Sequence, residues 1–390
     1  MFAHPSHVVV VGAGLAGAHT CRQLREQGYA GAITLVGAEQ HLPYDRPPLS
    51  KQVLLGEMSS SVIDLDLVAL DVTVSLGRRA RGLRPGVLET DGGEVAGDAF
   101  VLATGSRPVT LPGDGGTVLR TIDDALALRA ALVPGARVVI VGAGWIGGEV
   151  ATAAARAGCR VTVLEGAPWP LLAPLGEEGR QVAAWYEAAG VELRTSVSVG
   201  AVEDTRVVLD GGEDIRADVV VVGVGARPET GWLAASGLEL DPGVVVDAHL
   251  ATSWPGVVAV GDVASWWSGL YGRRVRVEHW DGALKSPAVA VSTLLGVSAV
   301  HDPVPYFWSD QLGHFLQFAG DREGADATVH RGDPAGPAPW SVCWLQGGRL
   351  VAVLAVDRPK DLVQGRRLIA AGQPVDPERL ADPAVPLASA

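Results

Sequence analysis

Two glycine-rich runs of the chain share one spacing and could perform the same chemistry. Both follow the pattern G-x-G-x-x-G, with glycines at Gly12, Gly14, Gly17, Gly142, Gly144 and Gly147. In this pattern the first glycine permits a tight turn, the second leaves room for a pyrophosphate, and the third lets helix and strand pack closely. The helix that follows directs its partly positive end at the phosphates. The sequence therefore predicts two dinucleotide-binding loops, and the alternative is two turns that serve packing alone.

An acidic residue follows each loop at the distance expected for a ribose contact. Glu39 lies 27 residues after Gly12, and Glu165 lies 23 residues after Gly142. A carboxylate there accepts hydrogen bonds from ribose hydroxyls and repels a 2′-phosphate. The residues after Glu165 are Gly, Ala, Pro and Trp, without an arginine. The second site is therefore predicted to prefer NADH to NADPH, unless Glu165 is an unpaired surface residue.

Strands and helices of the α/β type are expected to position these residues. A strand–helix–strand order occurs twice, over residues 7–11, 15–27 and 32–36 and again over residues 137–141, 145–157 and 160–164. β-Branched runs predict the strands, and helical spacing of apolar residues predicts the helices. From about residue 306, clustered aromatic residues and alternating strands indicate a separate, largely antiparallel domain. The predicted fold class is α/β, with two Rossmann-like dinucleotide-binding domains and an α+β C-terminal domain.

Composition excludes several classes of protein. The chain has 390 residues and a net charge of −13, which argues against general nucleic-acid binding. Cys21, Cys159 and Cys343 lie far apart, so they form no zinc or disulfide pattern, and we expect no metal site. The first two are expected to be buried structural thiols. Because we see neither a leader nor an apolar run of membrane-spanning length, we expect a soluble, cytoplasmic protein without membrane contact.

Motifs along nearly the whole chain resemble a known family. They are VVGAGLAG (10–17), LPYDRPPLSK (42–51), LATGSRP (102–108), VVIVGAGWIGGE (138–149), VGVGARPE (222–229), VAVGDVA (258–264), VEHWDGA (277–283) and PYFWSDQLG (305–313). The chain resembles the NADH-dependent, FAD-containing ferredoxin reductases of bacterial oxygenases, the family of putidaredoxin reductase and biphenyl dioxygenase reductase. This implies a glutathione-reductase-like fold with three domains. They are an FAD domain (1–112 and 244–305), an NADH domain (113–243) and a C-terminal interface domain (306–390).

The resemblance also implies site residues. For FAD these are Gly12, Gly14, Leu15, Ala16, Gly17, Glu39, Arg46, Pro47, Lys51, Ala103, Thr104, Gly105, Arg107, Gly261, Asp262, Glu278, His279 and Trp280. For NADH they are Gly142, Gly144, Trp145, Ile146, Gly147, Glu149, Glu165, Gly223, Val224 and Gly225. Three of them would be catalytic, because Lys51 would pair with Glu149 near the flavin N5 and Trp280 would lie beside the isoalloxazine. The alternatives are a solvated lysine, an exposed helix glutamate and a core aromatic residue.

The implied reaction carries electrons from NADH through FAD to a small iron–sulfur ferredoxin that serves an oxygenase. Disulfide reductases of similar fold place a redox cysteine near PPLSK, where this chain has Ser50, so electrons would pass directly to an external acceptor. The alternative acceptors are a rubredoxin or a small quinone-like molecule. A DNA-binding sensor like the apoptosis-inducing factors is disfavoured by the negative charge. The expected oligomeric state is a monomer or weak homodimer.

An acidic ferredoxin would need a local basic patch on this acidic chain. Three clusters offer one: Arg78, Arg79, Arg81 and Arg84; Arg273, Arg274 and Arg276; and Arg358, Lys360, Arg366 and Arg367. We rank the second cluster first because it leads directly into VEHWDGA. The alternative is that these arginines only solvate the surface.

Overall fold

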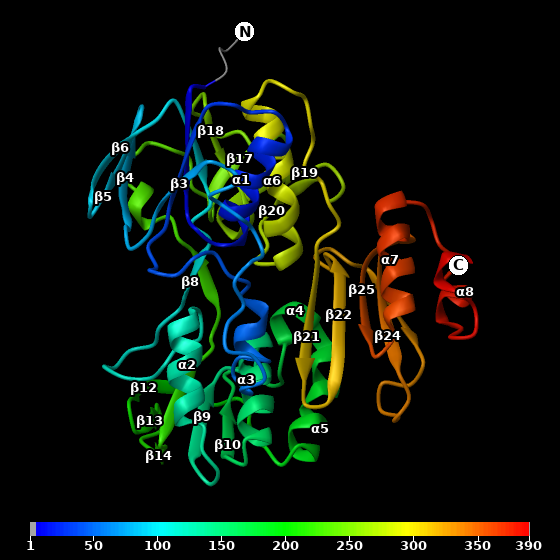
Figure 1. Cartoon of the computed structure of the whole chain (residues 1–390). Helices are drawn as coiled ribbons and strands as arrows, with labels where there is room; N and C mark the ends of the chain where they lie inside the picture. Colours follow the sequence, from blue (N-terminus) through cyan, green and yellow to red (C-terminus); the bar gives the residue numbers. More distant parts are fainter. Residues whose placement is uncertain (1–4, 390) are drawn as a thin grey trace. The chain divides into compact units, whose positions relative to one another are not determined.

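The computed structural model describes residues 5–389, and its chain divides into two compact units (Figure 1). The first unit comprises Met1–Asp45, Val62–Arg107 and Arg227–Phe307. The second unit comprises Arg46–Ser61, Pro108–Ala226 and Trp308–Ala390. The chain passes between the units near the short strands β8 (Ser106–Pro108) and β16 (Ala226–Pro228). The domain boundaries expected from the sequence assign residues 46–61 and residues 227–243 differently, and they stay a prediction.

A five-stranded parallel sheet forms the centre of the first unit. Its order is β18 (Val257–Ala259), β7 (Ala99–Leu102), β1 (His7–Val11), β2 (Ala32–Val36) and β3 (Val72–Ser75). The valines of β1 are almost completely buried, as expected for a strand covered on both faces. Helices α1 (Leu15–Glu26) and α6 (Trp280–Leu294) lie side by side next to this sheet (Figure 1).

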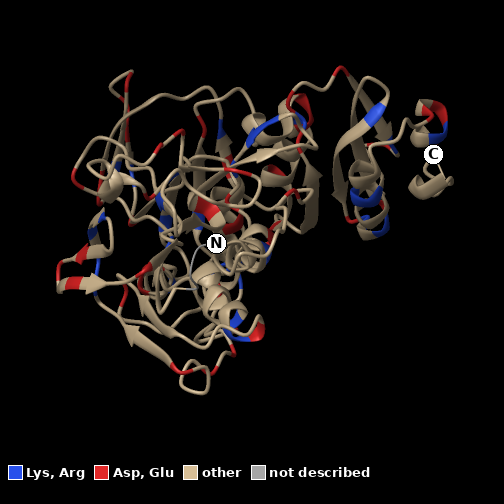
Figure 2. Ribbon diagram, turned by 90° about the horizontal axis from the view of Figure 1, so that it is seen from above, with Lys and Arg blue, Asp and Glu red and all other residues tan. Residues whose placement is uncertain are grey.

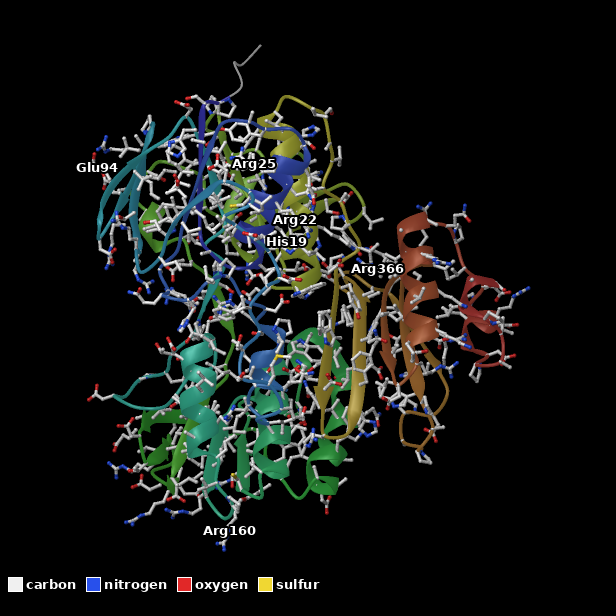
Figure 3. The ribbon with its side chains drawn as sticks, viewed as in Figure 1. His19, Arg22, Arg25, Glu94, Arg160 and Arg366 are labelled. Carbon is white, nitrogen blue, oxygen red and sulfur yellow. The ribbon has the colours of Figure 1, made fainter. Side chains whose placement is uncertain are left out.

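The C-terminal end of α1 is fixed by one arginine. The Arg25 guanidinium donates hydrogen bonds to the carbonyls of Tyr29 (2.7 Å), Gly31 (2.9 Å) and Leu70 (2.8 Å). Figure 3 labels Arg25 on this helix. These bonds connect α1 to the segments before β2 and β3, so the helix that begins at the first glycine loop has a defined position on the sheet.

Two smaller sheets complete the first unit. The antiparallel one contains β4 (Ala80–Arg84), β5 (Val87–Thr90) and β6 (Gly93–Ala96). The mixed one contains β17 (Val244–Val246), β19 (Ala264–Ser268) and β20 (Arg273–Val275). Single 3-10 turns occur at Gly231–Leu233 and Gly261–Val263.

The second unit repeats the strand–helix–strand order of the first. Its parallel sheet has the order β11 (Glu192–Arg194), β10 (Arg160–Leu164), β9 (Arg137–Val141) and β15 (Val219–Val222). The helices of this region are α2 (Ile122–Ala131), α3 (Trp145–Arg156), α4 (Leu172–Leu175) and α5 (Arg180–Ala188). A 3-10 turn at Gly176–Gly179 joins α4 to α5. An antiparallel meander contains β12 (Val199–Glu203), β13 (Arg206–Leu209) and β14 (Asp214–Arg216).

The C-terminal region is built on a five-stranded sheet. Its order is β21 (Tyr306–Gln311), β22 (His314–Gly320), β25 (Arg349–Val356), β24 (Trp340–Gln346) and β23 (Ala327–Arg331). The pairs from β22 to β23 are antiparallel, as predicted. Helices α7 (Pro359–Ala371) and α8 (Pro377–Ala381) and a 3-10 turn at Leu387–Ser389 follow the sheet. The predicted fold class is therefore confirmed.

Candidate functional site

The first and third glycines of each loop are required by the fold itself. Gly12 and Gly142 have φ values of +117° and +103°, in the region that favours glycine. A Cβ atom on Gly17 would lie 1.9 Å from the carbonyl oxygen of Gly12, and one on Gly147 would lie 2.0 Å from that of Gly142. Only glycine fits where the helix crosses its preceding strand this closely.

The second glycine of each loop has room around it. A Cβ atom on Gly14 would meet no atom within 4 Å, and one on Gly144 would meet only the carbonyl oxygen of Gly223, at 3.9 Å. Contacts within the protein therefore do not require glycine at these positions. The free space fits a pyrophosphate that approaches the backbone, as the pattern predicts.

The N-termini of α1 and α3 are open to an anion. Each begins after a glycine cap that offers no side-chain hydrogen bond, and neither first turn contains an acidic residue. Helix α2 differs, because Thr121 and Asp124 form a capping box at its N-terminus. The first-turn N–H groups of α1 and α3 therefore lack the partners that a protein usually supplies, as a phosphate site requires.

The two candidate ribose acids are held in place. Glu39 accepts a hydrogen bond from the Tyr44 hydroxyl. The Glu165 carboxylate accepts from the backbone N–H of Ala143 (2.6 Å), inside the second glycine loop, and from that of Ala167 (2.8 Å). Glu165 is thus not an unpaired surface residue. Each carboxylate oxygen can accept more than one hydrogen bond, so ribose hydroxyls can still be bound.

The other predicted contacts gather at the carboxyl edges of the two parallel sheets. In the first unit, residues 103–105 follow β7, the neighbour of β1, and residues 261–262 follow β18, which lies next to β7. In the second unit, residues 223–225 follow β15, next to the loop after β9. Ligands of open α/β sheets bind at this edge. Two apolar side chains there, Ile146 and Val224, are 42% and 37% exposed, as expected for a surface that a ligand covers.

Lys51 and Glu149 form an ion pair in the second unit. The Lys51 Nζ lies 2.7 Å from Glu149 Oε1, and the side chains are only 12% and 4% exposed. Lys51 follows the 3-10 turn Pro47–Ser50, and Glu149 lies in the second turn of α3. The structure therefore brings the predicted pair together and rules out a solvated lysine and an exposed helix glutamate. Their roles in the reaction stay predictions.

Three further residues at this ion pair were not predicted from the sequence. The hydroxyls of Ser50 and Ser309 both donate to the Glu149 carboxylate, and the Gln311 side chain donates to Ser309. Ser309 and Gln311 are 0% and 1% exposed, although both are polar. The only available signal was the alternation in YFWSDQ, which places two polar residues on one face of a strand.

The N-terminus of α6 carries two predicted residues. The Trp280 indole N–H donates to the Asp45 carboxylate at 2.7 Å, so the ring has a polar partner. The His279 ring packs against Phe307 in a tilted arrangement, with 4.7 Å between ring centroids, and burial lowers the pKa of His279 to about 4. The His279 Nδ1 is buried and has no hydrogen-bond partner among the described residues. An unpaired nitrogen at a helix N-terminus fits a site that a polar cofactor completes.

The remaining predicted FAD contacts have partners within the protein. Asp262 accepts from the Ser106 hydroxyl at 3.0 Å. Glu278 is exposed and pairs with Arg276 at 2.7 Å.

Two other predicted residues contact Glu229. The Thr104 hydroxyl donates to the Glu229 carbonyl at 2.9 Å, and the 56% exposed Arg107 side chain lies 4.0 Å from the Glu229 carboxylate. In the second unit, Arg46 donates to the Arg120 carbonyl.

The three cysteines are free thiols. Burial raises the pKa of the Cys21 and Cys343 thiols to about 12, which makes them poor nucleophiles. The expectation that Cys159 is buried was wrong, because this residue is half-buried and its thiol contacts the Val133 carbonyl at 3.4 Å. The glycine turn that ends α3 leaves the following residue near the surface.

Comparison with known proteins identifies the family. The model of the pyridine nucleotide–disulphide oxidoreductases matches residues 6–286, and that of the reductase C-terminal domain matches residues 306–390. The chain belongs to the ferredoxin–NAD(+) reductases within the pyridine nucleotide–disulphide oxidoreductases. The resemblance inferred from the motifs is thereby confirmed.

Relatives match this reductase over its whole length. It is 41% identical to the ferredoxin–NAD(+) reductase component of the anthranilate 1,2-dioxygenase system of Burkholderia cepacia, over 97% of this chain and 98% of the relative. The crystal structure of Fdr9 matches with a TM-score of 0.94 and 47% identity, over 98% and 99% of the two chains. The covalent putidaredoxin reductase–putidaredoxin complex matches with a TM-score of 0.92 and 35% identity, over 98% and 97%.

Within residues 5–389, no helix is long and apolar enough to cross a membrane. The same residues contain no group of three or more His, Cys, Asp or Glu that could hold a metal ion.

Proposed function

We propose that this reductase transfers electrons from NADH through one FAD per chain to a small iron–sulfur ferredoxin that serves an oxygenase. FAD, when bound, accepts a hydride and releases electrons one at a time. The observation that carries the proposal is the buried pair of Lys51 and Glu149. A fixed ammonium group stabilises the negative charge that a hydride delivers, and Glu149 keeps this ammonium from moving.

Each glycine loop would bind one dinucleotide. The loop of Gly12, Gly14 and Gly17 would hold the FAD pyrophosphate, with Glu39 at the ribose, and the second loop would hold NADH in the same way. The open second glycines and uncapped helices support this assignment. The unpaired His279 Nδ1 would be satisfied by bound FAD.

The nucleotide preferred by the second loop follows from Glu165. Its carboxylate is fixed by two backbone N–H groups, so it cannot swing away from a 2′-phosphate without losing both bonds. A fixed negative charge at this position favours NADH over NADPH.

We propose that ferredoxin docks on α7 and not on the cluster of Arg273, Arg274 and Arg276, which we ranked first from the sequence. Arg274 donates to the carbonyls of Val246 and Ser265, and Arg276 is paired with Glu278. Internal hydrogen bonds therefore occupy these two guanidinium groups.

The positive charge of the arginines on the β4–β6 sheet is also partly neutralised. Arg84 pairs with Glu89 and Glu94, and Arg81 pairs with Asp91. An acidic partner would meet a surface of mixed charge there.

Helix α7 presents cations without such neutralisation. Lys360 and Arg367 are exposed, and neither has an ion-pair partner in the described part of the chain. Val363, which is 51% exposed, lies between them at helical spacing. Figure 2 shows basic positions gathered on this helix, and Figure 3 labels Arg366 there. A basic face with an apolar centre fits a small acidic ferredoxin.

Turnover with the purified protein tests the proposal. We expect a yellow protein with one non-covalent FAD per chain that NADH reduces much faster than NADPH does. Cytochrome c reduction should depend on an added oxygenase ferredoxin. NADH oxidation that depends on an added rubredoxin or quinone, together with no turnover with ferredoxins, would assign a different acceptor.

A further inference from the structure

We propose that Ser309 is a positioning residue for hydride transfer, because its hydroxyl fixes the carboxylate that holds Lys51. This inference rests on the proposed function. Ser309 lies in β21, is completely buried, and donates to Glu149 Oε1 at 2.5 Å. The Lys51 Nζ contacts the same oxygen at 2.7 Å. One carboxylate oxygen therefore has two donors, one from the residue that follows the Pro47–Ser50 turn and one from the C-terminal sheet.

The direction of the hydrogen bonds near Ser309 is determined by Gln311. Its Nε2 lies 3.2 Å from the carbonyl oxygen of Trp145, which can only accept, so this atom is the amide nitrogen. The same nitrogen lies 3.0 Å from the Ser309 Oγ and donates to it. The Ser309 hydroxyl hydrogen is then directed at Glu149, and the chain of donors ends on the carboxylate.

The contact between β21 and α3 keeps this series of hydrogen bonds in place. The backbone N–H of Leu312 donates to the Thr152 hydroxyl at 2.8 Å, one helical turn beyond Glu149. A Cβ atom on Gly148 would lie 2.3 Å from Gln311 Oε1, so glycine at this position provides the space that the Gln311 side chain occupies.

The second oxygen of Glu149 completes the arrangement. Ser50 donates to Oε2 and precedes Lys51 directly in the chain. With donors on both oxygens the carboxylate cannot rotate freely, and the ammonium group of Lys51 is restricted to one position. Hydride transfer depends strongly on such fixed charges, whereas NADH binding depends on the glycine loop.

Stopped-flow reduction of the FAD-loaded protein by NADH tests the role of Ser309. We expect Ser309→Ala to lower the limiting rate by on the order of tenfold, because a donor to a charged group is lost. The NADH dissociation constant and the FAD content should stay unchanged. Ser309→Thr keeps the hydroxyl and should restore most of the rate. Ser309→Cys preserves the volume, has a weaker donor and should also be slow.

Ser341→Ala is the matched control. Ser341 is also completely buried in the C-terminal sheet and donates to a buried carboxylate, that of Asp361, at 2.7 Å. Ser341→Ala should lower the free energy of unfolding about as much as Ser309→Ala does, and it should leave the limiting rate of flavin reduction unchanged. The proposal is overturned if both serine-to-alanine variants behave alike, or if Ser309→Cys reacts as fast as the parent protein.

A second measurement does not depend on turnover. Acetylation of Lys51, followed by mass spectrometry, should be several-fold faster in Ser309→Ala than in the parent or in Ser341→Ala, because the ammonium group is less restricted. Equal labelling in all three proteins would contradict the inference even if the protein reduces ferredoxin. A parent protein that NADH does not reduce would instead refute the proposed function, and the labelling result would still decide the role of Ser309.

Discussion

Glu149 illustrates how a carboxylate can be kept charged in a nearly dry environment. Its side chain is 4% exposed, and Lys51, Ser50 and Ser309 all donate to it. Burial of a charged group without partners costs several kcal/mol, so these donors are required for the charge to persist. Buried ion pairs often contribute little net stability, so the proposed role in hydride transfer gives this pair a reason to be here.

Replacement of Glu149 by glutamine removes the charge and keeps the shape. We expect Glu149→Gln to slow flavin reduction by NADH about tenfold or more, since a charge-assisted hydrogen bond contributes about 2–3 kcal/mol. FAD content should not change. Stopped-flow absorbance measures the rate. The control is Glu178→Gln, which changes another buried glutamate in the same unit, paired with His330 at 2.8 Å.

The nucleotide preference can be tested at Glu165. The double variant Glu165→Ser, Gly166→Arg removes the fixed carboxylate and adds a guanidinium group next to it. A side chain has room at Gly166, where a Cβ atom would meet only the Val197 carbonyl oxygen, at 3.8 Å. The ratio of kcat/KM for NADH over NADPH should fall by at least tenfold. A parent enzyme that uses both nucleotides equally would contradict the role of Glu165.

At the scale of elements, the strand–turn–helix unit separates glycines that packing requires from glycines that packing does not require. A Cβ atom on Gly147 would lie 2.0 Å from the Gly142 carbonyl oxygen, whereas one on Gly144 would meet only the Gly223 carbonyl oxygen, at 3.9 Å. The backbone of Gly144 has φ −80° and ψ −168°, which an alanine also adopts.

The two substitutions should therefore have different effects. Gly144→Ala should leave FAD content and Tm close to those of the parent and raise the KM for NADH about tenfold, because the methyl group fills the space for the pyrophosphate. Gly147→Ala should destabilise the protein by about 1–3 kcal/mol or more, because the methyl group overlaps with backbone. Thermal unfolding and steady-state kinetics measure both. Equal losses of stability would show that the space at Gly144 is not a binding site.

At the scale of the whole molecule, His301 should make stability depend on pH. It is 4% exposed, its ring contacts Trp266, and burial lowers its pKa from 6.5 to about 4. Above pH 6.5 neither state binds the proton, but below it the unfolded chain does and the native state does not. The contribution of His301 to the free energy of unfolding is therefore fully present above pH 6.5 and is lost as the pH falls towards 4. At about pH 5 the free energy of unfolding should be lower by about 2 kcal/mol.

Urea unfolding near neutral pH and at about pH 5 measures this effect. His301→Gln cannot take up the proton, so its stability should fall less than that of the parent between the two conditions. Carboxylates titrate equally in both proteins and cancel in the comparison. Parallel losses would show that His301 titrates normally in the native state.

Docking of an acidic ferredoxin depends on local rather than net charge. The chain carries −13, and under the proposed function the exposed cations of α7 would overcome the long-range repulsion of an acidic partner. Lys360→Glu with Arg367→Glu should lower ferredoxin-dependent cytochrome c reduction at least tenfold at low salt and flatten its salt dependence. Ferricyanide reduction by NADH should stay unchanged, because a small acceptor needs no docking surface.

The matched control is Arg81→Glu with Arg84→Glu, on the β4–β6 sheet, where acidic side chains partly neutralise the arginines. It changes the net charge by the same amount and should have little effect on ferredoxin-dependent cytochrome c reduction. If it slows ferredoxin reduction equally, net charge rather than the α7 surface controls docking. If both activities of the α7 variant fall together, the substitutions have damaged the fold.

The sequence by itself determined what depends on neighbours in the chain. The glycine loops, the flanking strands and the acids Glu39 and Glu165 were predictable, because turn geometry and β-branched periodicity are local properties. The fold class followed from the repetition of this unit. The pairing of Lys51 with Glu149 came from the resemblance to a family, since nothing in the spacing of two residues so distant in sequence indicates a contact.

Only the tertiary structure decided which side chains surround that pair and which cations are available. Ser309 lies 160 residues from Glu149, and their contact depends on how β21 packs along α3. The Gln311 side chain of β21 fits against α3 because Gly148 has no side chain there. Likewise, Arg274 appeared free in the sequence, but the folded backbone offers it two carbonyls. A hydrogen bond between distant segments is fixed by the packing of whole elements, and local patterns carry no information about that packing.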